Sequence, residues 1–399
     1  MTTLHLHCRA ADHFEAAFRT QIEAFESANP EIKVQLHLTE IDEHYSKLKS
    51  LPEDCDLYLS VTDWIPEAIS LGAFQPLDSQ LASDAPQDWP TGWSESMRGL
   101  QVGPDGKTYA LPWHDGPEVL HCREDFFDDP DEQVKFLHKY GRELGPPKDW
   151  DEFMEVARFY TRPETRLWGC CLGSYPDGHN NVYDFLIHLW SRGGQLLGES
   201  GQPAFNSKAG EEALTFLHDL YHNYKVASLD CLKMNSNQSG EFYAKGRVAM
   251  MWNWAGFASF AEAPESRIPG LSRCYPIPGG VSLNIYWVLA MTSNSKSPEA
   301  AWAFMKHCAT PKMDLAATQA GINGVRLSTW RNPEIQEQFK QYEVIEEVHK
   351  NVMSPPQIAE YPAINEVLSR MVDDVLNRRS KVKEALDSAE IECRNLILP

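Results

Sequence analysis

The sequence predicts an α/β protein built on doubly wound parallel sheets. Short apolar runs of strand length alternate with amphipathic segments of helical period from the N-terminus onward. The chain has 399 residues, which is too long for one ordinary core and long enough for two. Hydrophobic residues make up 42% and charged residues 23%, which is typical of a globular protein.

The first 72 residues have the pattern of a βαβαβ unit. Strands are expected at 4–8, 33–38 and 56–61. The apolar positions of the helix between the first two strands are Phe14, Phe18, Ile22 and Phe25. A further helix is expected from about Ile65 to Leu71, and Gly72 can end it in the left-handed conformation. This opening predicts the start of a parallel sheet.

The same alternation continues to the end of the chain. A second unit is expected to begin at Tyr109–Pro112, with its strand at Glu118–Cys122. The other expected helices are 151–160, 182–192, 208–223 and 298–308, with a strand region at 281–291. The end of the chain, about 363–398, predicts two helices with a break near 378–380. No internal repeat or low-complexity segment is present in the sequence.

The stretch Glu241–Gly256, EFYAKGRVAMMWNWAG, carries the strongest indication of a binding site. A helix ends at Lys245-Gly246, and 247–251 then runs apolar as a buried strand does. Trp252 and Trp254 follow where that strand ends, which is where ligands bind in open α/β sheets. Indole faces beside an amide suit a sugar, which offers apolar C–H faces and hydroxyl groups. Both tryptophans could equally be core residues.

This stretch resembles the "F..GK.AM....W.G" signature of the family 1 extracellular solute-binding proteins of ABC importers, of which maltodextrin-binding proteins are members. Other segments resemble that family in the family's own order: 14–34 (its opening helix and "F...NP.I.V" exit), 56–78 ("D......W......G...PLD"), 106–126 ("GK.Y.LP......LYYN.D.F"), 147–157 ("P.TW.E....A") and 324–327 (its late "P.R" turn). The resemblance thus covers nearly the whole chain.

The resemblance implies a two-lobed periplasmic-binding-protein fold of type II, with the ligand held between two α/β lobes. It places the first lobe at about 1–111 plus 262–312 and the second at about 113–258 plus 325–399. Crossings are then expected near 111–115, 254–262 and 310–325. The implied function is non-enzymatic: a monomer binds a sugar or short oligosaccharide by hinge closure and aromatic stacking, then delivers it to the permease subunits of an ABC importer.

The resemblance and the residues together indicate ten ligand-binding candidates. They are Arg9, Asp12, Asp63, Trp64, Trp113, Asp115, Trp254, Tyr286, Trp287 and Arg326. Arg9 and Asp12 follow the first strand, although Asp12 could instead stabilise the start of the next helix. Arg326 could hold hydroxyls in its fork or could be a structural arginine. Of Trp252 and Trp254, only Trp254 is expected to face a ligand. The polar loop 175–181 is a weaker candidate.

Charge and motifs exclude several other classes. A net charge of −21 disfavours nucleic acid, whose phosphates need a basic surface. No Walker, GxSxG or GxGxxG motif occurs, and no cofactor is expected. His5, His7 and Cys8 fit strand alternation better than a zinc site, and HDLYH at 218–222 lacks the glutamate of HExxH. A carbohydrate-active enzyme remains an alternative, because acidic residues and tryptophans occur in the same segments.

The sequence is consistent with more than one cellular compartment. The sequence shows no membrane-spanning run, and Thr2-Thr3 leads into a strand without a signal peptide. A periplasmic or extracellular protein whose leader was removed and a leaderless, intracellular sugar sensor both fit. Nine scattered cysteines favour mostly free thiols, since their number is odd and their spacing indicates no disulfide framework.

Overall fold

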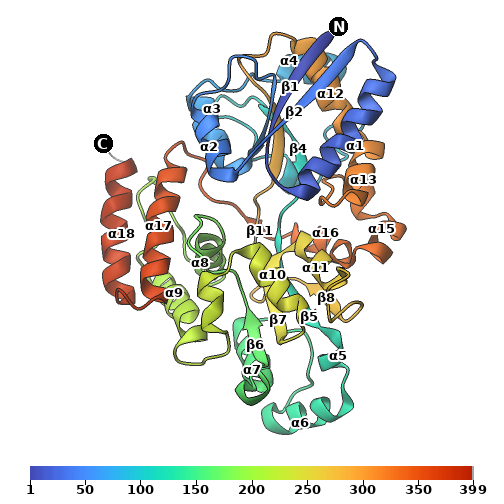
Figure 1. The fold of residues 1–399 in the computed structure, drawn as a ribbon. Coiled ribbons are helices and arrows are strands. Elements are labelled where there is room, and N and C mark those ends of the chain that lie inside the picture. The colour runs from blue at the N-terminus through green and yellow to red at the C-terminus, as the bar shows by residue number, and fades with distance from the viewer. Residues whose placement is uncertain (398–399) are drawn as a thin grey trace. The chain divides into compact units, whose positions relative to one another are not determined.

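The structure is a computed structural model that describes residues 1–397 (Figure 1). The chain forms two compact units. Unit 1 comprises 1–116, 284–336 and 357–362, and unit 2 comprises 117–283, 337–356 and 363–399. The chain therefore passes from one unit to the other after residues 116, 283, 336, 356 and 362. Each unit has its own sheet and its own helices.

Unit 1 is built on a five-stranded sheet of order β2-β1-β3-β10-β4 (Figure 1). Its strands are β1 (Thr2–Arg9), β2 (Ile32–Thr39), β3 (Leu57–Val61), β4 (Ala110–His114) and β10 (Trp287–Met291). β1 pairs in parallel with β2 and β3, whereas β10 runs antiparallel to both β3 and β4. β4 therefore runs in the same direction as β1 and β3. The βαβαβ opening predicted from the sequence is present.

Most helices of unit 1 bury apolar side chains, whereas the helix Asp78–Asp84 buries none. The helices are α1 (Asp12–Ala28), α2 (Ile41–Lys49), α3 (Ile65–Ser70), α4 (Asp78–Asp84), α12 (Pro298–Cys308), α13 (Pro311–Gln319), α14 (Leu327–Trp330) and the start of α15 (Pro333–Gln338). α1 contacts α12 and α13, and its predicted apolar residues Phe14, Phe18 and Phe25 are buried. Short 3-10 helices cover Thr62–Trp64 and Glu95–Met97.

Unit 2 is built on a four-stranded mixed sheet of order β6-β7-β5-β8 (Figure 1). Its strands are β5 (Glu118–Arg123), β6 (Trp168–Cys171), β7 (Val248–Trp254) and β8 (Ser272–Tyr275), and a separate parallel pair consists of β9 (Ser282–Leu283) and β11 (Val352–Met353). β6 and β7 are parallel, and β5 is antiparallel to β7 and β8. The predicted strand 247–251 overlaps β7, which begins one residue later and extends to Trp254.

Helices surround the unit 2 sheet. They are α5 (Glu124–Phe127), α6 (Pro130–Tyr140), α7 (Trp150–Tyr160), α8 (Asn180–Trp190), α9 (Lys208–Tyr221), α10 (Ser236–Ala244), α11 (Ala258–Glu262), α16 (Ile345–Val348), α17 (Tyr361–Leu376) and α18 (Val382–Ile397), with 3-10 helices at Pro163–Thr165, Leu229–Lys233, Ala255–Phe257 and Lys340–Glu343. Every side chain of α8 is buried. A helix that is buried on all sides is central to its domain.

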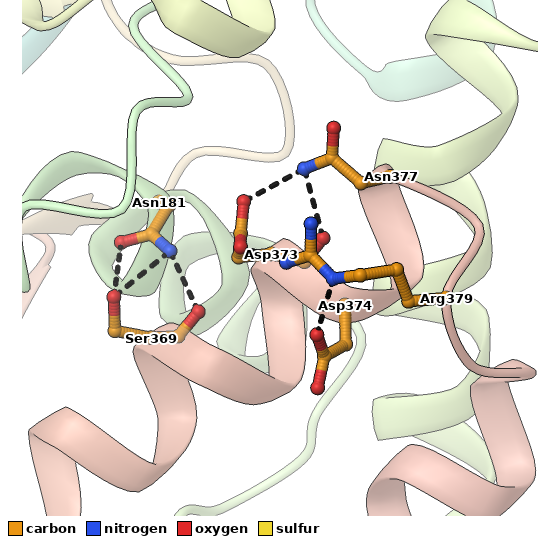
Figure 2. Close-up of polar contacts among 6 residues, drawn as sticks. All are labelled: Asn181, Ser369, Asp373, Asp374, Asn377 and Arg379. Atoms are coloured by element: carbon orange, nitrogen blue, oxygen red, sulfur yellow. Dashed lines mark hydrogen bonds and ion pairs between the residues drawn. The ribbon is translucent and has the colours of Figure 1, made fainter.

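Polar contacts attach α17 to α8 and stabilise the C-terminal end of α17 (Figure 2). Asn181 Nδ2 donates to the backbone oxygen of Ser369 at 3.0 Å and to its hydroxyl at 3.1 Å. After α17, Arg379 Nε donates to Asp374 at 2.7 Å, and the guanidinium also pairs with Asp373. The predicted break at 378–380 is therefore a fixed turn, in which Arg378 has a φ of 58°.

Three details differ from the sequence-based expectations. The strand at 110–114 completes the unit 1 sheet rather than starting a second unit. The chain leaves unit 2 after residue 283 rather than near 254–262, because β8 pairs with β5 and keeps the segment after β7 in unit 2. It leaves unit 1 after 336 rather than within 310–325, since α13 and α14 pack in unit 1. The predicted helix end at Leu398 and lobe end at Pro399 lie outside the described residues.

All nine cysteines are free and buried, which confirms the prediction of mostly free thiols. Among residues 1–397, no helix is long and apolar enough to cross a membrane. Within the same range, no three His, Cys, Asp or Glu side chains are grouped so that they could hold a metal ion.

Candidate functional site

One edge of the unit 1 sheet gathers several of the predicted site residues of that unit. β1, β3 and β4 run in the same direction, so their carboxyl ends meet at this edge. Arg9 ends β1, Asp63 follows β3, and Asp115 follows β4. Trp287 begins the antiparallel β10 and pairs with Val61 at the end of β3. We call these positions the unit 1 edge.

Arg9, Trp64 and Trp287 form an aromatic corner at the unit 1 edge. The indole rings of Trp64 and Trp287 meet edge to face with centroids 6.0 Å apart. The Arg9 guanidinium carbon lies 5.3 Å from the centroid of Trp287 and 5.7 Å from that of Phe14, within the range of cation–π attraction. Arg9 and Trp287 are partly exposed, whereas Trp64 is buried. The corner therefore presents one cation and one indole face.

Two histidines next to Arg9 are kept neutral. Burial, reinforced by Arg9, lowers the pKa of His13 to about 4, and Asp12 opposes that shift only in part. Burial, with contributions from His13 and Arg9, lowers the pKa of His114 well below its usual value. Neutral imidazoles can both donate and accept hydrogen bonds. Asp12 is exposed in the first turn of α1, and its side chain does not cap that helix.

Asp63 and Asp115 are buried at the unit 1 edge. Asp63 lies in the 3-10 helix after β3 and is 3% exposed. The backbone N–H of Asp115 donates to the oxygen of Asn323 at 2.9 Å, and Asn323 Nδ2 donates to the oxygen of Asp115 at 3.2 Å. One carboxylate oxygen of Asp115 accepts from the N–H of Gly116 at 2.8 Å. The Asp115 carboxylate is therefore fixed beside the point where the chain leaves unit 1.

Trp113, Tyr286 and Arg326 lie in the interior of unit 1 rather than at its edge. Trp113 stacks on Phe18 at 4.0 Å and donates its indole N–H to Gln21 at 2.9 Å. The Tyr286 hydroxyl donates to Gln101 at 2.6 Å and accepts from the N–H of Leu100. These contacts give both side chains structural roles within unit 1.

Arg326 is 1% exposed, and the protein itself surrounds its guanidinium. The group donates to the backbone oxygens of Ala309 at 2.7 Å and Gln87 at 3.0 Å, and it pairs with Asp88. It also stacks on Trp93, 4.1 Å from the ring centroid. Arg326 therefore has a structural role, because its guanidinium fixes separate segments of unit 1 to one another.

The corresponding edge of the unit 2 sheet carries Trp254. β6 and β7 end there, and β5 begins there because it runs antiparallel to β7. The Trp254 indole N–H donates to Asn180 Oδ1 at 3.0 Å, and the ring meets Tyr183 edge to face at 5.7 Å. Trp254 is partly exposed, while its neighbour on the strand, Trp252, is 3% exposed. We call this set the unit 2 edge.

Trp252 and Trp254 project from the same face of β7, because residues two apart on a strand point in the same direction. Asn180 and Asp184 lie four apart on α8 and therefore on one helix face. Asp184 Oδ1 accepts the indole N–H of Trp252 at 2.5 Å, beside the Asn180–Trp254 bond. The two tryptophans differ in depth rather than in direction, and Trp254 is the one nearer the surface.

Sequence reasoning did not identify Glu118, Asn180 or His13 as individual site residues. Glu118 begins β5 and pairs in register with Trp254, although its side chain is 2% exposed. A glutamate at the start of an otherwise apolar strand was the available signal. A second signal was that Asn180 and Asp184 are four residues apart, as on one helix face, and Trp252 and Trp254 two apart, as on one strand face. This spacing is informative only once the helix is known to face the strand.

Surface hollows elsewhere in unit 2 have a different character. One, of about 530 Å³, lies along α9 and is lined largely by charged side chains together with Phe216 and Tyr224. Another, of about 540 Å³, lies at the turn between α17 and α18 beside Arg379. The two edges instead combine indole faces with carboxyl, amide, imidazole and guanidinium groups. That combination can stack against flat apolar faces and hydrogen-bond hydroxyl groups.

The family model of bacterial extracellular solute-binding proteins matches residues 11–314. The chain belongs to this family. The match confirms the resemblance found in the sequence, and it includes most of unit 1 and the sheet of unit 2. The members of this family are binding proteins.

Solved structures show the same fold over nearly the whole length of this solute-binding protein. The maltose-bound MalE3 protein of Thermotoga maritima has 23% identity and a TM-score of 0.86, covering 99% of this chain and 100% of that one. A solute-binding protein of an ABC transporter from Agrobacterium radiobacter, in complex with ribitol, has 22% identity and a TM-score of 0.85, covering 99% and 98%. The GacH receptor of Streptomyces glaucescens, studied with acarbose, has 22% identity and a TM-score of 0.81, covering 100% and 99%. The predicted two-lobed, type II fold is therefore confirmed.

Proposed function

We propose that this solute-binding protein binds a sugar, a polyol or a short oligosaccharide and delivers it to the permease subunits of an ABC importer. Its family supports the transport role. Similar structures have been solved with maltose, ribitol, tagatose or mannitol bound, and all four compounds are rich in hydroxyl groups. We further propose that it acts outside the cytoplasmic membrane, as other extracellular solute-binding proteins do, and that it is a monomer without a cofactor.

The observation that carries the proposal is that the Trp254 side chain is held in place while its ring remains partly exposed. Its N–H is already bonded to Asn180, so a ligand does not need to satisfy that group, and its ring is partly exposed at the unit 2 edge. A fixed indole face is suited to stack on the C–H face of a sugar ring. At the unit 1 edge, Arg9 and Trp287 offer a cation and a second indole, while Asp12, Asp63 and Asp115 can accept hydroxyl hydrogens.

The experiment is a calorimetric titration with maltose, ribitol, tagatose and mannitol. Truncating a buried aromatic anchor in a binding site costs about 2 kcal/mol or more, so Trp254→Ala should lose roughly thirtyfold in affinity for whichever compound binds. Trp168→Ala is the matched control, because Trp168 is also partly exposed but lies at the other end of the same sheet. A folded Trp254→Ala variant with unchanged affinity would remove Trp254 from the site.

The non-enzymatic part of the proposal needs a separate measurement. A solute-binding protein releases its ligand unchanged, whereas a glycosidase needs two carboxyl groups at a defined separation across the bond that it cleaves. Prolonged incubation with maltose and other disaccharides, followed by chromatography, should return the starting compounds. Formation of monosaccharides that depends on the protein would replace the transport proposal with the enzymatic one.

A further inference from the structure

Unit 2 contains a pair of buried acids immediately behind Trp254. Glu118 is 2% exposed and Asp184 is 3% exposed. Glu118 pairs in register with Trp254 across β5 and β7, so the two side chains lie on the same face of the sheet. Asp184 lies on α8, one turn after Asn180, which holds the Trp254 indole. The pair therefore borders the residue to which we assign ligand stacking.

The two acids differ in their hydrogen bonds. Asp184 Oδ1 accepts the indole N–H of Trp252 at 2.5 Å. Glu118 Oε2 is buried and has no hydrogen-bond partner among residues 1–397. A donor stabilises the charged form of a carboxyl group, and burial without a donor stabilises the neutral form. The proton of such a pair accordingly belongs on Glu118, with Asp184 as the ionised acceptor of Trp252.

We propose that Glu118 is a positioning residue that carries a proton at neutral pH, and that loss of this proton displaces Asp184 and the tryptophans it supports, which weakens ligand binding at the unit 2 edge. The effect on ligand rests on the proposed function, whereas the proton on Glu118 does not. An ionised Glu118 would place a second buried negative charge next to Asp184 with no compensating donor. Trp252 is tied to Asp184 directly, and Trp254 is tied to Asn180 on the same face of α8.

The surroundings of the pair favour retention of the proton. Burial raises the pKa of Glu118 well above its usual value, and Asp184 adds to the shift. Burial also raises the pKa of Asp184, Trp252 opposes that shift, and Asp177 in the preceding loop adds to it. Other titratable groups on neighbouring elements include Tyr221 on α9, His121 on β5, and His188 and Arg192 at α8 and its C-terminal end. β5 and β8 also carry Arg123 and Arg273, and β8 carries Tyr275. β7 and β9, with sequences VAMMWNW and SL, contribute no charge.

The direction of the pH effect follows from these shifts. A carboxyl group whose pKa is higher in the folded than in the unfolded protein binds more protons when folded. Its contribution to the free energy of unfolding is therefore fully present below the unfolded value of about 4 and is lost as the pH rises through the folded value. The contribution of this pair to the stability of unit 2 should therefore decrease as the pH becomes alkaline.

The first test measures unfolding by denaturant, without ligand, from about pH 5 to about pH 9. Glu118→Gln reproduces the shape of the protonated acid and cannot ionise, so its stability relative to wild type should increase with pH, by at least about tenfold in the unfolding equilibrium constant over this range. Asp184→Asn keeps an acceptor for Trp252 but removes the neighbouring charge, so it should move the wild-type transition to lower pH. Glu241→Gln, at an exposed position on α10, should parallel wild type. Parallel profiles for Glu118→Gln and wild type would overturn the proposal.

A spectroscopic readout keeps the proposal testable even if the Glu118 variant folds poorly. Infrared spectra of the wild-type protein at neutral pH should show the carbonyl band of a buried protonated carboxyl group, which should weaken in Asp184→Asn and be absent in Glu118→Gln. Tryptophan fluorescence of the wild-type protein should change with the same midpoint as the infrared band. Absence of a protonated carboxyl band in wild type at neutral pH would overturn the proposal without any variant.

The second test examines the link to ligand, with maltose and ribitol as the probes. The dissociation constant of the wild-type protein should rise at least about tenfold between about pH 6 and about pH 9, and that of Glu118→Gln should change little. The same pH dependence in both proteins would overturn the ligand part alone. If neither probe binds at any pH, the choice of ligand under the proposed function fails, and the unfolding and infrared measurements still decide whether Glu118 holds the proton.

Discussion

His7 shows how strongly the environment of one side chain can determine its charge. It lies on β1 opposite His37 of β2, and the two rings stack with centroids 4.6 Å apart and planes 13° apart. Both ring nitrogens are buried without a hydrogen-bond partner among the described residues. Burial, with His37 and Lys47 adding to it and Asp54 opposing it, lowers the pKa of His7 to about 4. His7 is therefore neutral throughout the physiological range.

We predict that His7 makes unit 1 sensitive to acid. Because its pKa is lower in the folded protein than in the unfolded chain, its contribution to stability is present above about pH 6.5 and is lost as the pH falls towards about 4. His7→Phe retains a stacked ring but no titrating group, so it should abolish a loss on the order of 3 kcal/mol over this interval. Denaturant unfolding at a series of pH values measures the difference. The exposed His138→Gln on α6 serves as control, and an equally steep acid loss in His7→Phe would contradict the prediction.

At the scale of elements, α7 and β6 of unit 2 approach each other very closely. A Cβ added at Gly169 would lie 2.0 Å from the backbone oxygen of Ala157, far inside any real contact. Backbone atoms cannot move aside as a flexible side-chain end can, so only glycine lets β6 sit directly against α7. The short sequence WGCC of β6 is thus determined by packing as well as by strand preference.

We predict that Gly169→Ala destabilises the protein by about 2–3 kcal/mol, the cost of overpacking a close contact. Gly145→Ala is the matched control, because its added methyl group would meet no atom within 4 Å. Denaturant unfolding of both variants gives the comparison. Equal stability of the two variants would show that α7 can shift away from β6 at little cost.

Much of the element pattern could be predicted because each element carries its own signal. The helix predicted at 298–308 coincides with α12, and the helices predicted at 151–160 and 208–223 lie within a few residues of α7 and α9. The division between units carried no comparable signal. β4 and β10 are short apolar strands that could pair in either sheet, and it is the pairing of β10 with both β3 and β4 that places them in unit 1.

The candidate site was predictable where strand ends determine position, and less so where side-chain direction matters. Arg9, Asp63, Asp115, Trp254 and Trp287 lie at the carboxyl edges expected of an open sheet. Trp113, by contrast, points into the packing of α1, and Arg326 reaches back to Ala309 and Gln87. No local pattern distinguishes an arginine that holds backbone oxygens from one that holds a ligand. The ligand-binding roles of all these residues remain predictions, whereas the structure shows the contacts that each makes within its own unit.

At the scale of the whole molecule, the nine cysteines do not identify a compartment on their own. Every one of them is buried, and burial raises the pKa of thiols such as Cys231 and Cys393, each to about 12. The thiolate is the reactive form, so such groups react slowly with oxidants and other thiols. Unpaired cysteines of this kind are compatible with an oxidising environment as well as a reducing one. The number of cysteines is therefore weak evidence for an intracellular location.

The distribution of these thiols permits a test that reports on each unit. Cys8, Cys55 and Cys308 belong to unit 1, and Cys122, Cys170, Cys171, Cys231, Cys274 and Cys393 belong to unit 2. The unfolded, non-reduced protein should react at all nine positions, whereas the native protein should react slowly, at rates set by opening of each unit. Four disulfides in the unfolded protein would contradict the structure.

Ligand should slow the labelling of the cysteines in each unit that it stabilises. A ligand that binds only the native protein stabilises it by mass action, by about 2.7 kcal/mol at a hundred times the dissociation constant. We therefore predict that saturating ligand slows alkylation of the unit 1 and unit 2 cysteines alike, by up to about a hundredfold where labelling requires unfolding. Mass spectrometry of peptides after timed alkylation, with and without maltose or whichever compound calorimetry identifies, measures the two sets in one sample. Slowing confined to the unit 2 cysteines would show that Trp254 and its neighbours bind the ligand without the Arg9, Trp64 and Trp287 corner.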